Sequence, residues 1–345
     1  GPIDVVFFDG EADDLREQTW QLNPKTVVTR GAIATPEQYV PGARIEGAWE
    51  SCLTMGTQWQ YKPTNDVYKS GRELISLLIE TRAKGGNLLL NIGPKPDGEI
   101  PLEQEERLRE IALWMFVNGE AIYSTRPWVV PNEGEYYFTK KKNEDTVYVL
   151  LNTKQRWPYG TWRDITLRSV KLAPGATVSV LGQNDEVLEY QPNVVPKTTW
   201  RQTPQGLQIR AMHAQRLYND RKWPNPVVLK ITGAQPAFTP PTLSSARFRW
   251  DAASKTAVLE AALSGLGGET RLPVAFEYRS VKGLDLTERP GPFQRSAAVN
   301  VTAPGRFEIR VPGWQPGDVL EYRAVALHPL LEVYSLEERA SVPAP

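Results

Sequence analysis

Short apolar runs alternate with helix-like segments at the start of the sequence, and this alternation constrains the fold more than any other feature. The strand candidates are residues 4–9, 25–30, 47–54 and 87–92. Helical patterns lie between and after them, at residues 13–22, 70–84 and 102–117. Strands that alternate with helices in this way form parallel sheets with helical crossovers. The run 87–92 is apolar enough to be buried on both faces, which is typical of such sheets.

Two of the expected helices carry specific signals. Ser70 begins one of them, and Glu73 three residues later completes a capping box. The side chains predicted to be buried on this helix are Leu74, Leu77 and Leu78. On the helix at 102–117, the predicted buried side chains are Leu108, Ile111 and Met115.

Four strands are half the number that closes a (β/α)8 barrel. The sequence enters its first strand directly after Gly1-Pro2-Ile3. We therefore expect residues 1–127 to be a (β/α) barrel-type region that amounts to half a barrel. Half a barrel exposes two strand edges and an apolar interior, which are unfavourable in water. A second copy or an N-terminal segment is therefore expected to complete it.

After residue 127 the pattern changes to short strands separated by turn residues. Strand candidates lie at residues 147–151, 176–181, 206–209 and 227–231. Residues 128–235 are expected to form a β-sandwich. A Pro/Thr/Ser-rich linker then leads to about seven further strands, so residues 236–345 are expected to form a fibronectin-type or immunoglobulin-like β-sandwich. The predicted fold class is therefore multidomain, α/β plus all-β, with a half-barrel followed by two β-sandwich domains.

Composition excludes some classes of function. Lys plus Arg equal Asp plus Glu, 40 of each, so no net field recruits nucleic acid or an anionic membrane surface. No apolar run approaches the length of a membrane-spanning helix, and the first residues lack a signal-peptide pattern. Cys52 is the single cysteine, so no disulfide within the chain is possible. The histidines, His213 and His328, lie far from the barrel region, which leaves that region without a Ser-His-Asp triad or a His-based metal site.

Carboxylates near the strand ends are the best candidates for catalysis. Asp9 ends the first strand, and the carboxyl ends of parallel barrel strands face the active site. Its alternative role is a helix N-cap. Glycoside hydrolysis needs two carboxylates, one ionised and one protonated. Glu37, Glu46 and Glu50 could each supply the second carboxylate, or be solvated surface charges.

Three further side chains could line a sugar pocket. Arg30 ends the second strand, where it could hold a ring hydroxyl or a carboxylate, or form a structural ion pair. Trp49 and Trp59 could wall the pocket, because aromatic rings stack on sugars, or they could pack in the core.

Several segments together resemble glycoside hydrolase family 29, the α-L-fucosidases. Phe7-Phe8-Asp9-Gly10 is similar to the family's nucleophile strand, and Thr35-Pro36-Glu37 is similar to the segment that carries the acid/base in many members. Trp49-Glu50-Ser51-Cys52, followed by Trp59-Gln60-Tyr61, is similar to a further family stretch. The most distinctive matches are residues 84–94, 97–98, 100–101 and 118–123. The resemblance covers about residues 3–235 and leaves the last sandwich outside it.

The resemblance implies a retaining α-L-fucosidase, with Asp9 as nucleophile and Glu37 as acid/base. It also implies a substrate-binding group that consists of Phe7, Arg30, Trp49, Glu50 and Trp59. The substrate would be terminal α-L-fucose on an oligosaccharide or glycoconjugate, released through a covalent fucosyl-enzyme. Neither a metal nor an organic cofactor is implied. A periplasmic or extracellular location is expected, with the cytoplasm as the alternative.

One departure from the family qualifies this implication. The family's early strands, which carry the histidines and aromatic residues that grip fucose, have no counterpart in this sequence. Residues 1–127 then correspond to the C-terminal half of the catalytic barrel. Another piece or a second copy supplies the missing strands, or the chain is a non-catalytic carbohydrate-binding or scaffold protein. A different hydrolase on the same half-barrel, such as a galactosidase, is a third hypothesis.

Overall fold

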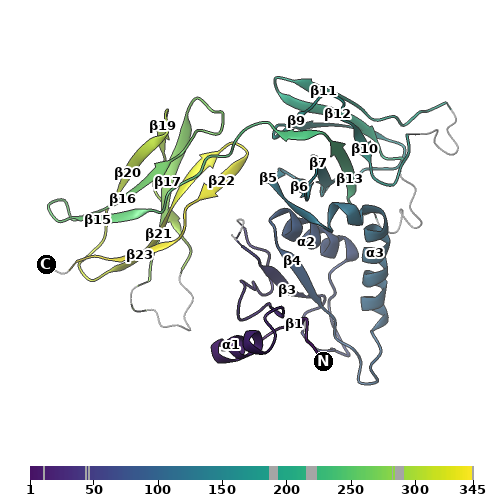
Figure 1. The fold of residues 1–345 in the computed structure, drawn as a ribbon, viewed down its shortest axis with the longest axis horizontal. Coiled ribbons are helices and arrows are strands. Elements are labelled where there is room, and N and C mark those ends of the chain that lie inside the picture. The colour runs from purple at the N-terminus through teal and green to yellow at the C-terminus, as the bar shows by residue number, and fades with distance from the viewer. Residues whose placement is uncertain are drawn as a thin grey trace. The chain divides into compact units, whose positions relative to one another are not determined.

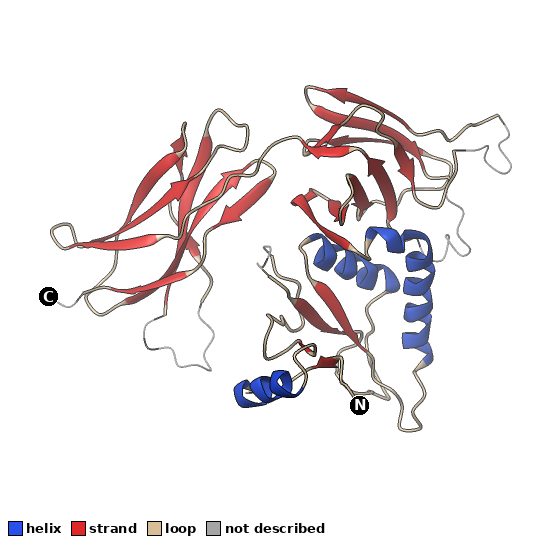
Figure 2. Cartoon of the chain, in the orientation of Figure 1, coloured by secondary structure: helices blue, strands red, loops and turns tan. Residues whose placement is uncertain are grey.

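A computed structural model describes residues 1–10, 12–42, 45, 47–185, 193–214, 224–281, 283 and 291–343. The chain forms two compact units, Gly1–Gln235 and Pro236–Pro345. Strands make up most of the regular structure in the described residues, and the few helices all lie in the first unit (Figures 1 and 2). None of the helices in these residues is both long and apolar enough to cross a membrane.

The four strands predicted at the start of the chain are present, and all their pairings are parallel. β1 (Val5–Val6) pairs with β2 (Val27–Val28). β3 (Glu50–Thr54) pairs with β4 (Asn87–Asn91). Ala34 forms a parallel bridge to Trp49, just before β3, and Glu37 forms one to Cys52 of β3, so the chain between β2 and β3 also runs along the sheet.

The prediction that β4 is buried on both faces is wrong. Leu89, at its centre, keeps 40% of its surface exposed. It pairs with Cys52 and lies on the same face of the sheet. Within the described residues no second layer covers Leu89 there, so an apolar strand remains open to solvent.

The helices of the first unit begin and end close to the predicted positions. They are α1 (Asp13–Leu22), α2 (Gly71–Ala83), α3 (Leu102–Asn118) and the short η1 (Gly119–Ala121). The predicted capping box is confirmed, because the Ser70 hydroxyl accepts from the N–H of Glu73 and the Glu73 carboxylate accepts from the N–H of Ser70. Leu74 is buried as predicted, but Ile75 and Ile79 replace Leu77 and Leu78 as the other apolar residues of the buried side.

The buried side of α3 differs more from the prediction. Trp114 is its apolar centre, while Ile111 and Met115 are only partly buried. The helix also buries polar side chains, and a partner from outside the helix bonds one of them, Glu110. Asn225 donates to Glu110 at 2.9 Å, and Trp114 itself donates to the carbonyl of Pro226 at 2.8 Å. Such partners come from distant parts of the sequence, so helical periodicity did not reveal them.

After η1 the first unit is built from antiparallel strands. The largest sheet has the order β10-β13-β7-β6-β5 and comprises β5 (Thr125–Glu133), β6 (Tyr136–Lys141), β7 (Thr146–Leu151), β10 (Val178–Val180) and β13 (Val227–Thr232). A second sheet has the order β11-β12-β8 and comprises β8 (Trp162–Leu167), β11 (Thr199–Thr203) and β12 (Gly206–Met212). A two-stranded sheet joins β9 (Val170–Leu172) to β14 (Ala234–Pro236). All four strands predicted between residues 147 and 231 are therefore present.

The helices and the five-stranded sheet share one hydrophobic core. Ile75 and Ile79 of α2 and Trp114 of α3 pack in the same cluster as Tyr148 and Val228 of the sheet. This shared core explains why residues 1–235 form one compact unit. The boundary at 127/128 stays a prediction.

The second unit has two sheets around a core of its own. One has the order β15-β16-β20 and comprises β15 (Arg247–Asp251), β16 (Thr256–Leu263) and β20 (Gly305–Val311). The other comprises β17 (Leu272–Ser280), β18 (Gln294–Arg295), β19 (Val299–Val301), β21 (Val319–His328), β22 (Leu331–Tyr334) and β23 (Glu338–Ser341). Leu259 and Ile309 of the first sheet share a buried cluster with Phe276 and Ala324 of the second. Nine strands are described where about seven were predicted, and the two additional ones, β18 and β19, span only two and three residues.

Candidate active site

The carboxyl ends of β1 and β2 bring Asp9 and Arg30 together. Backbone hydrogen bonds extend the parallel pairing beyond both strands: the N–H of Thr29 donates to the carbonyl of Val6 at 2.9 Å, and that of Phe8 donates to the carbonyl of Arg30 at 3.2 Å. Asp9 follows Phe8 directly, so its side chain lies beside Arg30. The Arg30 Nη1 atom is 3.4 Å from Oδ1 of Asp9.

Glu37 joins this pair from the chain segment beside β3. It forms a parallel bridge with Cys52, and the N–H of Gln38 donates to the carbonyl of Cys52 at 2.9 Å. This pairing turns the Glu37 side chain toward Arg30. The Arg30 Nη1 atom donates to Oε2 of Glu37 at 2.7 Å.

Asp9 and Glu37 therefore share one guanidinium nitrogen. Their two nearest oxygens can be no farther apart than the sum of the two distances to that nitrogen, 6.1 Å. Retaining glycosidases hold their carboxyl groups about 5–5.5 Å apart, whereas inverting ones need about 6.5–9.5 Å to admit a water. The bound concerns the two nearest oxygens, and a pair of carboxylates that shares one guanidinium nitrogen is close enough for the retaining arrangement.

The shared site is open to solvent. The Asp9 side chain is 83% exposed, that of Glu37 is 37% exposed and that of Arg30 is 34% exposed. The Phe7 ring, which is also exposed, lies with its centroid 5.6 Å from the Arg30 guanidinium carbon. Phe7 thus supplies an apolar surface directly beside the charged groups, which suits the apolar face of a sugar.

Glu50 and Cys52 extend the site into the sheet. They are two residues apart on β3 and therefore face the same side, the side of Glu37. Glu50 is only 8% exposed, and its Oε1 atom finds no hydrogen-bond partner within the described residues. Burial raises the pKa of the Cys52 thiol, and the negative charges of Glu37 and Glu50 raise it further. The thiol is therefore held protonated. The position of the Cys52 thiol between two carboxylates was not predicted, although the two-residue spacing of Glu50 and Cys52 on one strand could have indicated part of it.

The two tryptophans have different positions. Trp49 is completely buried, and its ring lies where a Cβ on Gly86 would come within 2.5 Å of it. Its predicted role as a pocket wall is corrected to core packing, because alternation along the strand turns Trp49 away from the face that carries Glu50. Trp59 lies on the loop after β3 with 37% of its surface exposed, so its role in substrate binding stays a prediction.

The remaining candidates fall outside this cluster. Glu46, an alternative acid/base, lies outside the described residues. Across the ranges that the structure describes, no group of three or more His, Cys, Asp or Glu side chains could hold a metal ion. His213 and His328 are buried in the all-β parts of the chain, as their sequence positions indicated.

Comparison with known proteins identifies relatives of the part that carries this site. The model of the family described as "Alpha-L-fucosidase" matches residues 1–120, which include every residue of the cluster. The plasma alpha-L-fucosidase of Rattus norvegicus is 34% identical over 185 residues, which cover 52% of this chain and 37% of that protein. The human plasma alpha-L-fucosidase is 38% identical over 159 residues, which cover 44% of this chain and 33% of that protein.

The fold has relatives among solved structures. Alpha-L-fucosidase isoenzyme 1 from Paenibacillus thiaminolyticus superposes with a TM-score of 0.51 and 23% identity, covering 67% of this chain and 58% of that one. At this identity the likeness concerns the fold alone. The chain spans about a third of the length of the curated relatives it matches.

Proposed function

We propose that this chain, whose residues 1–120 belong to the alpha-L-fucosidase family, supplies the two catalytic carboxylates of a retaining α-L-fucosidase. The observation that carries the proposal is the shared Arg30 nitrogen, which holds the nearest oxygens of Asp9 and Glu37 within 6.1 Å. A retaining mechanism needs a carboxylate pair at about this separation. The substrate is terminal α-L-fucose on an oligosaccharide or glycoconjugate.

In the proposed reaction, ionised Asp9 attacks the anomeric carbon of fucose. Protonated Glu37 gives its proton to the leaving oxygen as the glycosidic bond breaks, and a fucosyl ester forms on Asp9. Glu37, now a carboxylate, takes a proton from water, which attacks the anomeric carbon from the face that the leaving group vacated. The bond from that carbon to Asp9 breaks, which frees the Asp9 carboxylate and restores the original configuration. Arg30 contacts both carboxyl groups and orients them. Phe7 and Trp59 would line the sugar pocket.

Glu50 is the second candidate for the acid/base. It lies on the same face of the sheet as Glu37. Glu50 is far more buried than Glu37 and has an unpartnered oxygen within the described residues. Glu37 has the direct link to Arg30 and hence to Asp9. We favour Glu37 because it contacts Arg30, which also contacts the proposed nucleophile, Asp9.

The finer architecture is part of the proposal. Residues 1–127 would be the C-terminal half of a (β/α) barrel, followed by two β-sandwich domains. Val5, Phe7 and Leu89 leave apolar surface exposed on the parallel strands, which is costly in water. An N-terminal segment or a second copy would cover this surface and complete the sugar pocket. A binding-only scaffold is the less favoured role, because it would not need two carboxylates on one guanidinium. We also propose that the protein acts in the periplasm or outside the cell.

A trapping experiment tests the function directly. The chain should be assayed alone and together with a segment that supplies the missing strands. An activated 2-deoxy-2-fluoro fucoside forms a fucosyl-enzyme that hydrolyses slowly, and mass spectrometry of the peptides locates the adduct. We expect the label on Asp9 in the assembled form. A label on another carboxylate, or inverted product from an active preparation, would refute the proposed mechanism.

A further inference from the structure

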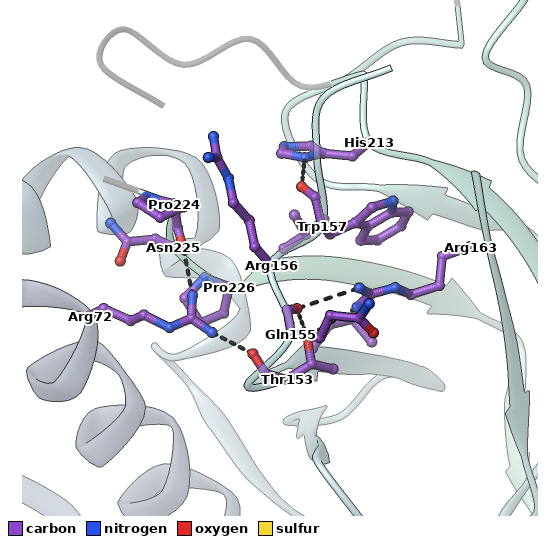
Figure 3. Close-up of a pocket in the computed structure, with 12 residues that line it drawn as sticks. Arg72, Thr153, Gln155, Arg156, Trp157, Arg163, His213, Pro224, Asn225 and Pro226 are labelled. Atoms are coloured by element: carbon purple, nitrogen blue, oxygen red, sulfur yellow. Dashed lines mark hydrogen bonds between the residues drawn. The ribbon is translucent and has the colours of Figure 1, made fainter. Parts of the chain in front are cut away.

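A pocket in the first unit shares no lining residue with the carboxylate cluster. It is lined by the start of α2, the end of β7, the residues that follow it, and the segment before β13 (Figure 3). Three arginines, Arg72, Arg156 and Arg163, line it. None of the residues assigned above to catalysis or fucose binding is among its lining residues.

Two of the arginines are fixed by neutral groups. Arg72 donates to the backbone carbonyls of Thr153 and Pro224 (Figure 3). Arg163 donates to the Thr153 hydroxyl at 3.0 Å, and its guanidinium carbon lies 5.0 Å from the centroid of a Trp157 ring. The hydrogen-bond partner of Arg163 positions its guanidinium without neutralising it, whereas the carboxylates of Glu110 and Glu135 act on the charge of Arg72. Each arginine carries five N–H donors, so both keep donors to spare.

Arg156 is the least constrained of the three. It is exposed, and no described residue forms a hydrogen bond or ion pair with its side chain. Figure 3 shows it extending between the side of the pocket that carries Pro224 and the side that carries His213. A guanidinium that has no partner among the described residues, beside two others at a concave surface, is a site for an anion, since the planar fork matches carboxylate and sulfate oxygens.

Two aromatic rings line the pocket, and the ring of Tyr159 lies beside one of them, outside the lining residues. Trp157 and His213 are buried lining residues, with ring centroids 5.8 Å apart. The Tyr159 ring lies 6.2 Å from that of His213 and has 36% of its surface exposed. An exposed ring beside a cationic pocket can stack on the apolar face of a pyranose while the pocket takes a charged substituent.

We propose that this pocket binds an acidic sugar, with the sulfate ester or carboxylate of the sugar held by Arg156 together with Arg163 and Arg72, and the sugar ring stacked on Tyr159. The chain as a whole is electrically neutral, so the attraction is local to these arginines. The site is a glycan-binding site separate from the proposed hydrolytic site. It stands on the pocket's own residues and does not depend on fucoside hydrolysis.

Calorimetric titration of the full chain tests the proposal with four probes: N-acetylglucosamine 6-sulfate, glucuronic acid, neutral N-acetylglucosamine and inorganic sulfate. We expect one or both acidic sugars to bind, the neutral sugar not to saturate, and binding to weaken as salt is raised. Inorganic sulfate should bind at least about threefold more weakly than the sulfated sugar, because it lacks the ring that stacks on Tyr159.

Three variants separate the contributions. Arg156→Gln should weaken acidic-sugar binding about tenfold or more, the loss expected for a charged hydrogen-bonding group. The matched control is Arg168→Gln, which removes an equally exposed positive charge outside the pocket and should leave binding unchanged. Tyr159→Ala should weaken binding of the sugar but not of inorganic sulfate.

Three results would overturn the proposal. In the first, neutral and acidic sugars bind equally or not at all. In the second, Arg168→Gln weakens binding as much as Arg156→Gln. In the third, inorganic sulfate binds as tightly as the sulfated sugar and Tyr159→Ala changes nothing, which would make the pocket a simple anion site.

Discussion

The parallel strands β1 and β4 of the first unit and the strand β17 of the second unit are all apolar, yet they differ in burial. At the centre of β17, Val274, Ala275 and Phe276 are completely buried. On the parallel strands, Val5 is 57% exposed and Leu89 is 40% exposed. Apolar composition made a strand recognisable in both places. Burial depended instead on whether a second layer lies over the strand.

The difference in burial between the two units coincides with the position of the candidate active site. The second unit closes its own core, with both sheets contributing to one cluster. The parallel region is packed only on the side of its helices, where Ile75 and Ile79 of α2 join the core of the five-stranded sheet. Asp9, Arg30 and Glu37 all lie on the open side. Strand ends that face solvent or a partner are where barrel enzymes place their active sites.

The largest expected effect tests whether the open side is the catalytic side. Asp9→Ala should lower the hydrolysis of an aryl fucoside by about ten-thousandfold or more in any assembly that is active, because no other group would attack the anomeric carbon. Azide should restore turnover and give an inverted fucosyl azide. Asp14→Ala removes a comparably exposed carboxylate on α1 and should leave the rate unchanged. Activity near wild type in the Asp9 variant would end the assignment of the nucleophile.

A stability comparison tests the difference in closure itself. Phe276→Ala should lower the free energy of unfolding of the second unit by about 3–5 kcal/mol, the cost of a cavity in a filled core. Leu89→Ala should cost less than about 1 kcal/mol in the chain alone, because much of that side chain is in water already. Urea unfolding monitored by circular dichroism measures both. With a segment that completes the barrel, the Leu89 cost should rise to about 2–5 kcal/mol. If it stays small there, Leu89 does not face a barrel interior.

A third measurement locates the acid/base within the open side. Glu37→Ala should slow fucosides with poor leaving groups about a hundredfold more than activated aryl fucosides, because only a poor leaving group needs the proton. Glu50→Ala is the comparison, since it removes the buried carboxylate of the same face. If the leaving-group dependence appears in Glu50→Ala and not in Glu37→Ala, the acid/base belongs to β3.

Local signals in the sequence predicted local structure well. Helix α1 begins and ends at the residues that its pattern indicated, and the capping box at Ser70 is present. Asp9 and Arg30 could be placed at neighbouring strand ends because parallel strands end at one edge. Their common link to Glu37 could not be predicted, since it depends on how residues 34–38 pair with β3.

Features made from distant segments escaped prediction. The burial of Trp49 depends on Gly86 of the following turn. The arginine pocket joins Arg72, Arg156 and Arg163 with His213, and no spacing in one stretch of sequence relates them. The exposure of β4 depends on whether another layer packs over it. An apolar run in the sequence looks the same in both cases, so it could not predict this exposure.

The smallest effect concerns the closed, helical side of the parallel region. Ser70→Ala removes one half of the capping box on α2 and should cost about 1 kcal/mol of unfolding free energy. The N–H and hydroxyl of Ser70, which donate to the Glu73 carboxylate at 2.7 and 2.8 Å, hold the pKa of that carboxyl below its usual value of 4.5. A carboxyl group whose pKa is depressed on folding adds stability above its unfolded pKa, and this stability is lost as the pH falls through the folded pKa.

The difference between wild type and Ser70→Ala should therefore be largest at neutral pH and shrink below about pH 4.5. Chemical unfolding at pH 7 and at successively lower pH measures it. Ser76→Ala is a less informative control, because the Ser76 hydroxyl donates to Asn152 and the substitution would also remove this contact outside the helix. Thr19→Ala on α1 serves better, since Thr19 is only partly buried and its hydroxyl donates to Leu15 of its own helix. An equal loss at pH 7 and at acid pH would show that the Ser70 hydroxyl acts only through the backbone N–H of Glu73. The helical side would then owe its order to the shared core rather than to the charged cap.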